Sequence, residues 1–396
     1  MKLKNRFRLP TIEGFNYPLL LAAYLGLFYF GMTDNGRGPA YPQIIRELGL
    51  SNREGSFLFA LSSFMSFLVP LTSSRWLAKV DLYRAIRASW GFLSLACISI
   101  GLSGLWRVAP LLFLGSIFLG MGMGTCGMSM NLMIEAGTPV SHRRRAFGGL
   151  HATYGIASFL APILFRFLMG FGFEWESFFF TMAFVGPLII FFTPTPETTY
   201  ALVPNKDSNQ KLPLTFLLTL GLCVGTYVAS EIVISSRLVL FLEEGLGLSN
   251  GEASLYLSGF FILLMLGRLS LSLIHLPIRG EYLLLGSLLL TTIFCLLGMQ
   301  GHLVFFSLCG LSMSIFFPSF MDWLAETFPE DFQKTTAFVM SGIGIHLVAM
   351  HLGFGNLAET LGVVKAMGLA LILTLISLVF LGVAFLWSHS LKKKLN

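Results

Sequence analysis

The chain has 396 residues, of which 55% are hydrophobic and 12% are charged, and its formal net charge is +6. A soluble domain contains roughly 25% charged residues, so this composition excludes an ordinary soluble protein. Apolar stretches recur along the whole chain, each long enough for the about 20 residues that cross a bilayer as a helix. They do not alternate apolar and polar residues as barrel strands do. The sequence therefore predicts an all-α membrane protein.

Twelve membrane-spanning helices are expected, six in each half of the chain. In chain order they cover 16–45, 52–74, 85–104, 108–136, 146–169, 174–193, 212–242, 250–274, 281–300, 303–327, 335–356 and 363–390. Nineteen of the 26 basic residues fall on one side of this topology and four on the other. Because basic loops stay in the cytoplasm, we expect both termini to be cytoplasmic and the protein to lie in the cell inner membrane. The positive charge then sets topology, and no nucleic-acid partner is expected.

An internal repeat relates the two halves. The segment LGLSNREGS at 48–56 recurs as LGLSNGEAS at 246–254, with seven of nine positions identical. Each copy contains the Ser-x-x-Glu pattern of a capping box that opens a helix. Two parallel six-helix halves are the architecture of one large class of secondary transporters. We therefore predict an N-terminal bundle at 1–193, a cytoplasmic linker at 194–211 and a C-terminal bundle at 212–396.

Several motifs, taken in order, resemble the fucose–glucose proton symporter branch of the major facilitator superfamily. They are Gly38-Pro39-Ala40-Tyr41-Pro42-Gln43, Asn131, Leu150-His151-Ala152, Tyr154-Gly155, Ala161-Pro162, Tyr227, Glu231, Gly267-Arg268 and Phe317-Pro318. The resemblance implies the major facilitator fold and, as a hypothesis, proton-coupled sugar transport. Two acidic residues typical of the branch would fall at Gly38 and Gly127, so this chain lacks both carboxylates where the resemblance places them.

Three carboxylates inside the expected spans are candidates for proton coupling. An ionisable side chain at the centre of a membrane helix costs at least about 2.5 kcal/mol, so each needs a partner or an aqueous cavity. Glu231 is expected to couple proton movement to transport, with Arg237 as a neighbouring guanidinium; the alternative is a structural hydrogen bond. Asp34 and Arg37 are either a displaced proton carrier with a substrate-binding arginine or a self-neutralising pair. Asp322 is the third candidate.

A second internal match, at an offset of 191 residues, equates Asn131 with Asp322 and Glu135 with Glu326. We therefore expect Asn131 and Asp322 to approach one substrate from opposite halves, or else to be polar contacts between helices. Trp323 would then add an aromatic platform. The remaining candidate substrate-binding residues are His151, Tyr154, Tyr227, Arg237 and His346.

A cytoplasmic gate is expected from Glu135 and Glu326, which are also repeat equivalents close to the cytoplasmic ends of their spans. Their expected partners are Arg143, Arg144, Arg145 and Lys334, or Arg75 and Arg268. Such ion pairs would latch the two bundles together and favour one conformation.

The function expected from these features is that of a monomeric secondary transporter that takes up a small polar solute, such as a sugar, together with a proton by alternating access. Two alternatives remain open: a proton-linked efflux antiporter for amphipathic compounds or lipids, and a sensor or scaffold on a transporter fold. The sequence contains no ATP-binding P-loop and no motif with metal-ligand spacing. We therefore expect no enzymatic activity, no metal and no cofactor besides a proton or sodium gradient, and only the solute and the lipid bilayer as partners.

Overall fold

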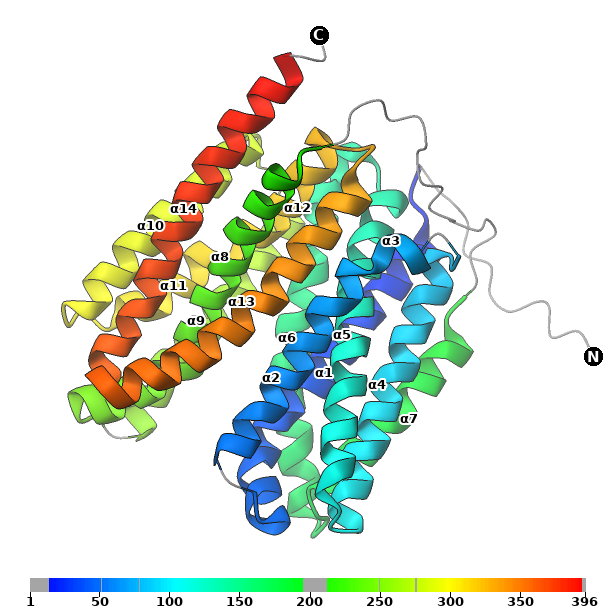
Figure 1. Cartoon of the computed structure of the whole chain (residues 1–396), viewed down its shortest axis with the longest axis vertical. Coiled ribbons are helices and arrows are strands. Elements are labelled where there is room, and N and C mark those ends of the chain that lie inside the picture. The colour runs from blue at the N-terminus through cyan, green and yellow to red at the C-terminus, as the bar shows by residue number, and fades with distance from the viewer. Residues whose placement is uncertain are drawn as a thin grey trace, which may run out of the picture. The chain divides into compact units, whose positions relative to one another are not determined.

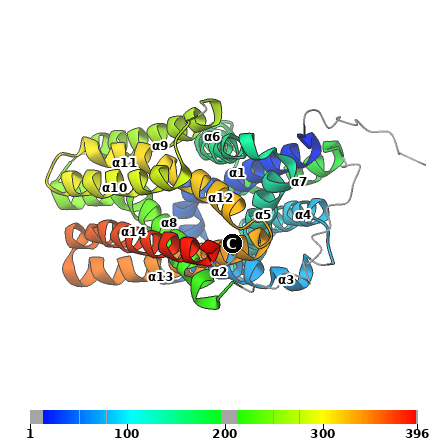
Figure 2. The ribbon, with the colours of Figure 1, turned by 90° about the horizontal axis from the view of Figure 1, so that it is seen from above.

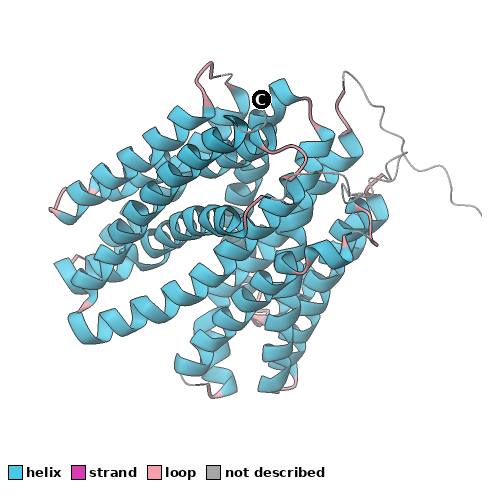
Figure 3. Ribbon diagram, turned by 45° about the horizontal axis from the view of Figure 1, so that its top comes forward, coloured by secondary structure: helices cyan, strands magenta, loops and turns pink. Residues whose placement is uncertain are grey.

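The computed structural model describes residues 14–50, 52–77, 79–194, 212–248, 250–274 and 276–393, and these residues are predominantly helical (Figures 1 and 3). Most of the expected linker and the basic N-terminal segment lie outside the described residues. So do Ser51 and Ser249, the first residues of the two expected capping boxes.

The chain divides into two compact units. The first comprises Met1–Arg143 and Thr153–Lys206, and the second comprises Arg144–Ala152 and Asp207–Asn396. The short segment Arg144–Ala152, the first turns of helix α6, therefore belongs with the second unit, a detail that the sequence did not indicate. The predicted boundaries at 193 and 212 otherwise remain a prediction.

Six long helices and one short helix build the first unit. They are α1 (Tyr17–Leu48), α2 (Asn52–Leu71), α3 (Ser73–Trp76), α4 (Leu82–Leu105), α5 (Ala109–Gly137), α6 (Arg143–Gly170) and α7 (Glu176–Phe192). Helix α1 begins where the Asn16 side chain accepts a hydrogen bond from the Leu19 amide, at 3.3 Å. It ends at Gly49, whose φ of 62° is a left-handed cap that favours glycine.

The second unit contains α8 (Leu214–Leu240), α9 (Asn250–Leu273), α10 (Gly280–Met299), α11 (Val304–Ser314), α12 (Phe316–Thr327), α13 (Phe332–Leu361) and α14 (Val363–Lys393). A π-turn at Phe241–Gly245 extends α8. Helix α8 packs against both α13 and α14 (Figure 2). Gly247, which the repeat equates with Gly49, also has a left-handed φ, of 70°. The two copies of the repeat therefore share the backbone conformation of this glycine as well as their sequence.

Nine helical segments of the described chain are long and apolar enough to cross a membrane, with α11 and α12 joined as Val304–Thr327. Shorter apolar helices cover Phe57–Leu71 and Glu176–Phe192. Together with α1, these segments follow the order of the twelve predicted spans.

Glycines set the spacing of helices in the first unit. A Cβ on Gly120 of α5 would overlap the Ser62 carbonyl of α2, and one on Gly124 would lie 3.1 Å from the Ser66 carbonyl oxygen. Because small residues let membrane helices approach closely, α5 holds α2 in place. This contact fixes the backbone from which the Ser62 side chain projects.

Candidate functional site

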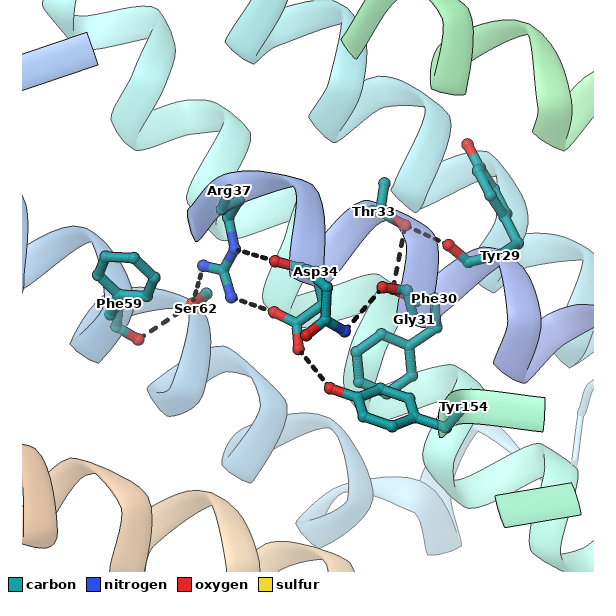
Figure 4. Close-up of polar contacts among 10 residues, drawn as sticks. Tyr29, Phe30, Gly31, Thr33, Asp34, Arg37, Phe59, Ser62 and Tyr154 are labelled. Atoms are coloured by element: carbon teal, nitrogen blue, oxygen red, sulfur yellow. Dashed lines mark hydrogen bonds and ion pairs between the residues drawn. The ribbon is translucent and has the colours of Figure 1, made fainter. Parts of the chain in front are cut away.

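The first unit contains a polar group that we call the Asp34 cluster: Asp34, Arg37, Phe59, Ser62 and Tyr154 (Figure 4). The Asp34 carboxylate accepts hydrogen bonds from the Arg37 guanidinium and from the Tyr154 hydroxyl, which lies 3.0 Å from Oδ2. Arg37 also donates to the Ser62 hydroxyl at 3.2 Å, and its Cζ lies 4.7 Å from the centroid of the Phe59 ring. The cluster thus joins α1, α2 and α6 around one ion pair.

Close packing of α1 and α6 brings Tyr154 to Asp34. A Cβ on Gly31 would lie 2.7 Å from the Ala157 Cβ, so the two backbones approach at this level. Gly31 precedes Asp34 by three residues and Tyr154 precedes Ala157 by three, which places the hydroxyl next to the carboxylate. The sequence singled out both residues but did not predict this contact.

The second unit contains a similar group, the Glu231 cluster, made of Tyr227, Glu231, Arg268 and the Met313 carbonyl. Nη2 of Arg268 lies 3.1 Å from Oε1 and 3.3 Å from Oε2 of Glu231. The Tyr227 hydroxyl is 2.8 Å from Oε2 of Glu231 and 2.7 Å from the Met313 carbonyl oxygen. Helices α8 and α9 therefore meet at the Glu231 carboxylate, and α11 is joined to them through the Tyr227 hydroxyl.

The Glu231 cluster is almost completely shielded from solvent. Tyr227 is 0% exposed and stacks on Phe316 with ring centroids 4.2 Å apart. The side chains of Arg268 and Glu231 are 7% and 13% exposed. At such burial, an ion that loses its partner pays a desolvation penalty of several kcal/mol. Each charge of this pair consequently depends on the other.

The partner of Glu231 differs from the expected one. Arg237 was expected beside Glu231, but its Cζ lies 5.2 Å from the centroid of the Phe354 ring. Six residues along an α-helix are about 1.7 turns, so Arg237 projects from a different face of α8. Arg268, expected in the gate, occupies the place expected for Arg237.

Asp322 is held by Arg144, which was expected to be a partner of the gate glutamates Glu135 and Glu326. Its Oδ2 accepts a hydrogen bond from Nε of Arg144 at 2.9 Å, and Nη1 of Arg144 donates to the Ile278 carbonyl oxygen at 2.8 Å. The neighbouring Trp323 ring lies in an aromatic cluster formed by Phe320, Phe328 and Phe385. The structure thus gives Trp323 a packing role, and its role as a substrate platform remains a prediction.

Three further candidates are buried or half-buried polar side chains. Asn131 is 0% exposed and donates from Nδ2 to the Gly127 carbonyl of its own helix at 2.7 Å. The Nδ1 atom of His346 donates to the Gly342 carbonyl at 2.7 Å. His151 contacts Phe317 edge-on, with ring centroids 4.6 Å apart. Asn131 and Asp322 belong to different units, so their joint role at one substrate stays a prediction.

The expected gate residues do not gather into one network. Glu135 pairs with Arg143 at 3.1 Å, whereas Arg268 pairs with Glu231. Glu326 and Arg75 are exposed and make no ion pair with any residue that the structure describes. The latch therefore remains a prediction for Glu135, Glu326 and Arg75, and Arg268 is better placed for another role.

Some contributors to these clusters gave little signal in the sequence. Ser62 and Phe59 are common residue types in an apolar helix, and nothing in their spacing distinguished them. Arg268 was singled out by the Gly267-Arg268 motif and as a gate residue, but its pairing with Glu231 was not predicted. Among the described residues, no group of three His, Cys, Asp or Glu side chains could hold a metal ion.

Comparison with known proteins adds a family to this geometry. The sequence profile described as Major Facilitator Superfamily matches residues 23–344. A curated relative, "Bypass of stop codon protein 6" of Saccharomyces cerevisiae, is 25% identical over 203 residues, which cover 48% of this chain and 39% of the relative. The chain thus spans about two fifths of the length of that relative.

Solved structures with the same fold include several transporters. The E. coli fucose:proton symporter FucP has a TM-score of 0.70 and 14% identity, covering 94% of this chain and 99% of its own. The proton:xylose symporter XylE has a TM-score of 0.73 and 12% identity, with 92% and 94% covered. The human organic anion transporter MFSD10 has a TM-score of 0.72 and 14% identity, with 92% and 99% covered. These likenesses confirm the predicted fold of twelve helices in two bundles.

Proposed function

Since this chain belongs to the Major Facilitator Superfamily, whose members are membrane transporters, we propose that it moves a small polar solute such as a sugar together with a proton by alternating access. The main support is the Glu231 cluster, in which Arg268 of α9 and Tyr227 of α8 hold a largely buried carboxylate. Two neighbours in fold, FucP and XylE, are described as proton symporters of fucose and xylose.

Glu231 fits the role of the proton carrier because its charge is balanced by one partner. While Glu231 is ionised, it neutralises Arg268 across 3.1 Å. When Glu231 takes up a proton, that attraction disappears and Arg268 is free to contact the solute. A carboxylate whose protonation differs between two conformations shifts the equilibrium between them, which is the requirement for coupling.

Orientation and location belong to the same proposal. The excess of basic residues on one side of the spans supports cytoplasmic termini and an inner-membrane location. We further propose that the protein works as a monomer, since a single chain contains both compact units, each with its own polar cluster.

The test uses purified full-length protein in liposomes with an internal pH dye and a panel of sugars. In the wild type, a transported sugar should acidify the lumen and accumulate against its gradient. Glu231→Gln should abolish accumulation and leave counterflow exchange, because the glutamine amide cannot take up and release a proton as the carboxylate does. Glu281→Gln is the matched control, since Glu281 pairs with the exposed Arg279 at the start of α10. Proton-driven accumulation that survives in Glu231→Gln would show that Glu231 is structural.

A further inference from the structure

Two nitrogen atoms near the Glu231 cluster are buried without a hydrogen bond. They are Nε of Arg268 and Nε2 of His151, and neither has a partner among the residues that the structure describes. As whole residues, Arg268 and His151 are 6% and 8% exposed. A buried polar atom without a partner is destabilising, so such atoms call for a ligand or another explanation.

The two atoms come from segments that pack directly on each other. Both Arg144–Ala152 and α9 belong to the second unit. A Cβ on Gly148 of α6 would lie 3.3 Å from the Arg268 carbonyl oxygen and 3.0 Å from the Ser272 amide nitrogen. Arg145 donates to the Ser272 carbonyl at 2.9 Å. His151 follows Gly148 by three residues and so lies on the face of α6 that packs against α9.

Charge balance indicates which ligand would fit. A guanidinium offers a planar fork of donors, and Glu231 uses the Nη2 end while Nε stays unused. When Glu231 is protonated, the cluster retains one uncompensated positive charge in a buried place. A neutral sugar cannot remove that charge, whereas a carboxylate can, because its two oxygens match the fork in geometry and sign.

We propose that Arg268 and His151 form a subsite for the carboxylate group of the transported solute, with Arg268 Nε and Nη2 binding the carboxylate and His151 Nε2 binding an adjacent hydroxyl. The inference rests on the proposed function and narrows its substrate class from small polar solutes to small hydroxycarboxylates such as sugar acids.

The subsite also explains how a proton and an anion would travel together. The carboxylates of Glu231 and of the solute compete for the same guanidinium, and protonation of Glu231 decides the competition in favour of the solute. Proton and solute therefore bind cooperatively, and binding should strengthen as the pH falls.

Other groups around Glu231 leave this competition intact. Tyr227 faces Glu231 from its own helix and Arg268 from α9, while the Met313 carbonyl of α11 accepts from the Tyr227 hydroxyl. On α14, Thr374 bonds to Ser230, and on α13 His346 lies beside Gly225, nearly two turns before Glu231. His151 approaches from α6 and is part of the subsite.

The test measures binding of D-glucuronate, D-gluconate and D-glucose to the purified full chain by isothermal titration calorimetry at acid and at neutral pH. We expect both carboxylates to bind, more tightly at acid pH, and glucose to bind at least tenfold more weakly. Glu231→Gln, which mimics the protonated carboxyl, should bind D-glucuronate at neutral pH as tightly as the wild type does at acid pH.

Two variants address the subsite itself. Arg268→Lys keeps the charge that Glu231 needs but removes the Nε donor, and should weaken D-glucuronate binding by about tenfold to a hundredfold. His151→Phe keeps a ring against Phe317 without nitrogens and should weaken it by about threefold to tenfold. Arg279→Lys, at an exposed arginine of the same unit, is the matched control and should bind like the wild type.

The outcomes separate this inference from the proposed function. Weaker binding of D-glucuronate to both subsite variants than to the wild type would support the subsite. If, in addition, no proton moved in liposomes, the subsite would stand and only the proposed proton coupling would be refuted. Glucose binding as tight as D-glucuronate binding, no binding of either carboxylate, or binding that both variants leave unchanged would overturn the subsite. Proton-driven accumulation of a neutral sugar would meanwhile leave the proposed function standing.

Discussion

The Asp34 and Glu231 clusters each contain a carboxylate, an arginine and a tyrosine, yet their ion pairs differ in where the arginine comes from. Arg37 lies one turn after Asp34 on the same helix, whereas Arg268 reaches Glu231 from α9. The arginine side chains are 15% and 7% exposed, respectively. A pair within one helix stays together however the helices move. A pair between helices can be broken by a proton or a small displacement, which makes the Glu231 cluster the better switch.

Two tyrosines extend the comparison to the duplicated sequence. Tyr29 and Tyr227 are 198 residues apart, the offset of the internal repeat, and both are 0% exposed. Each hydroxyl donates to a methionine carbonyl, that of Met182 at 2.9 Å or that of Met313 at 2.7 Å. The second partner is the Ser94 hydroxyl in the first half but the Glu231 carboxylate in the second. The equivalent tyrosines therefore bond only to uncharged groups in the first unit but also to one member of an ion pair in the second.

The largest expected effect comes from removing the interhelical arginine. Arg268→Gln leaves Glu231 buried without a counter-charge, and we expect a loss of about 3–5 kcal/mol in the free energy of unfolding. Arg37→Gln should cost less, about 1 kcal/mol, because both side chains of the Asp34–Arg37 pair are more exposed than those of the Glu231–Arg268 pair. Unfolding of both variants by denaturant in the same detergent measures the difference.

A double variant is the control for that prediction. Glu231→Gln added to Arg268→Gln removes the stranded charge and should restore most of the lost stability. Equal losses for Arg268→Gln and Arg37→Gln would contradict the distinction between the two clusters.

The next largest effect on stability is expected from replacing Tyr227 or Tyr29 by phenylalanine. Tyr227→Phe removes a hydrogen bond to a charged acceptor and should destabilise the protein by about 2 kcal/mol, because such bonds are stronger than neutral ones. Tyr29→Phe removes hydrogen bonds to neutral partners and should cost about 1 kcal/mol. The same unfolding assay compares them, and a larger loss for Tyr29→Phe would contradict the assignment of a strong bond to Tyr227.

The sequence was sufficient for the fold because long apolar helices and the repeat at 48–56 and 246–254 are local and periodic signals. It also identified Asp34, Arg37, Tyr154, Tyr227, Glu231 and Arg268 as residues of interest. It could not pair Glu231 with Arg268, because contacts between helices depend on helix rotation and on close approaches set by single glycines such as Gly148. Proximity along the chain favoured Arg237 instead, and helix geometry directs Arg237 elsewhere.

A smaller effect on transport is expected at Asp34. Asp34→Asn removes the charge of an intrahelical pair but keeps a side chain that can accept from Tyr154. Once a transported solute is identified, accumulation in liposomes should fall by less than about tenfold, the scale of one lost hydrogen bond. Abolished accumulation, as expected for Glu231→Gln, would show instead that Asp34 also carries a proton.

The smallest effect concerns Gly38, where the resemblance placed an acidic residue. Gly38 is exposed on α1, and a Cβ there would meet no atom within 4 Å. Gly38→Ala should therefore raise the free energy of unfolding by about 0.5–1 kcal/mol, because alanine loses less backbone entropy in a helix. Gly36→Ala, two residues earlier, is the control and should destabilise α1, since its Cβ would overlap the Phe178 ring. A gain in proton-driven accumulation in Gly38→Asp would show that a carboxylate at this position of the first unit supports coupling.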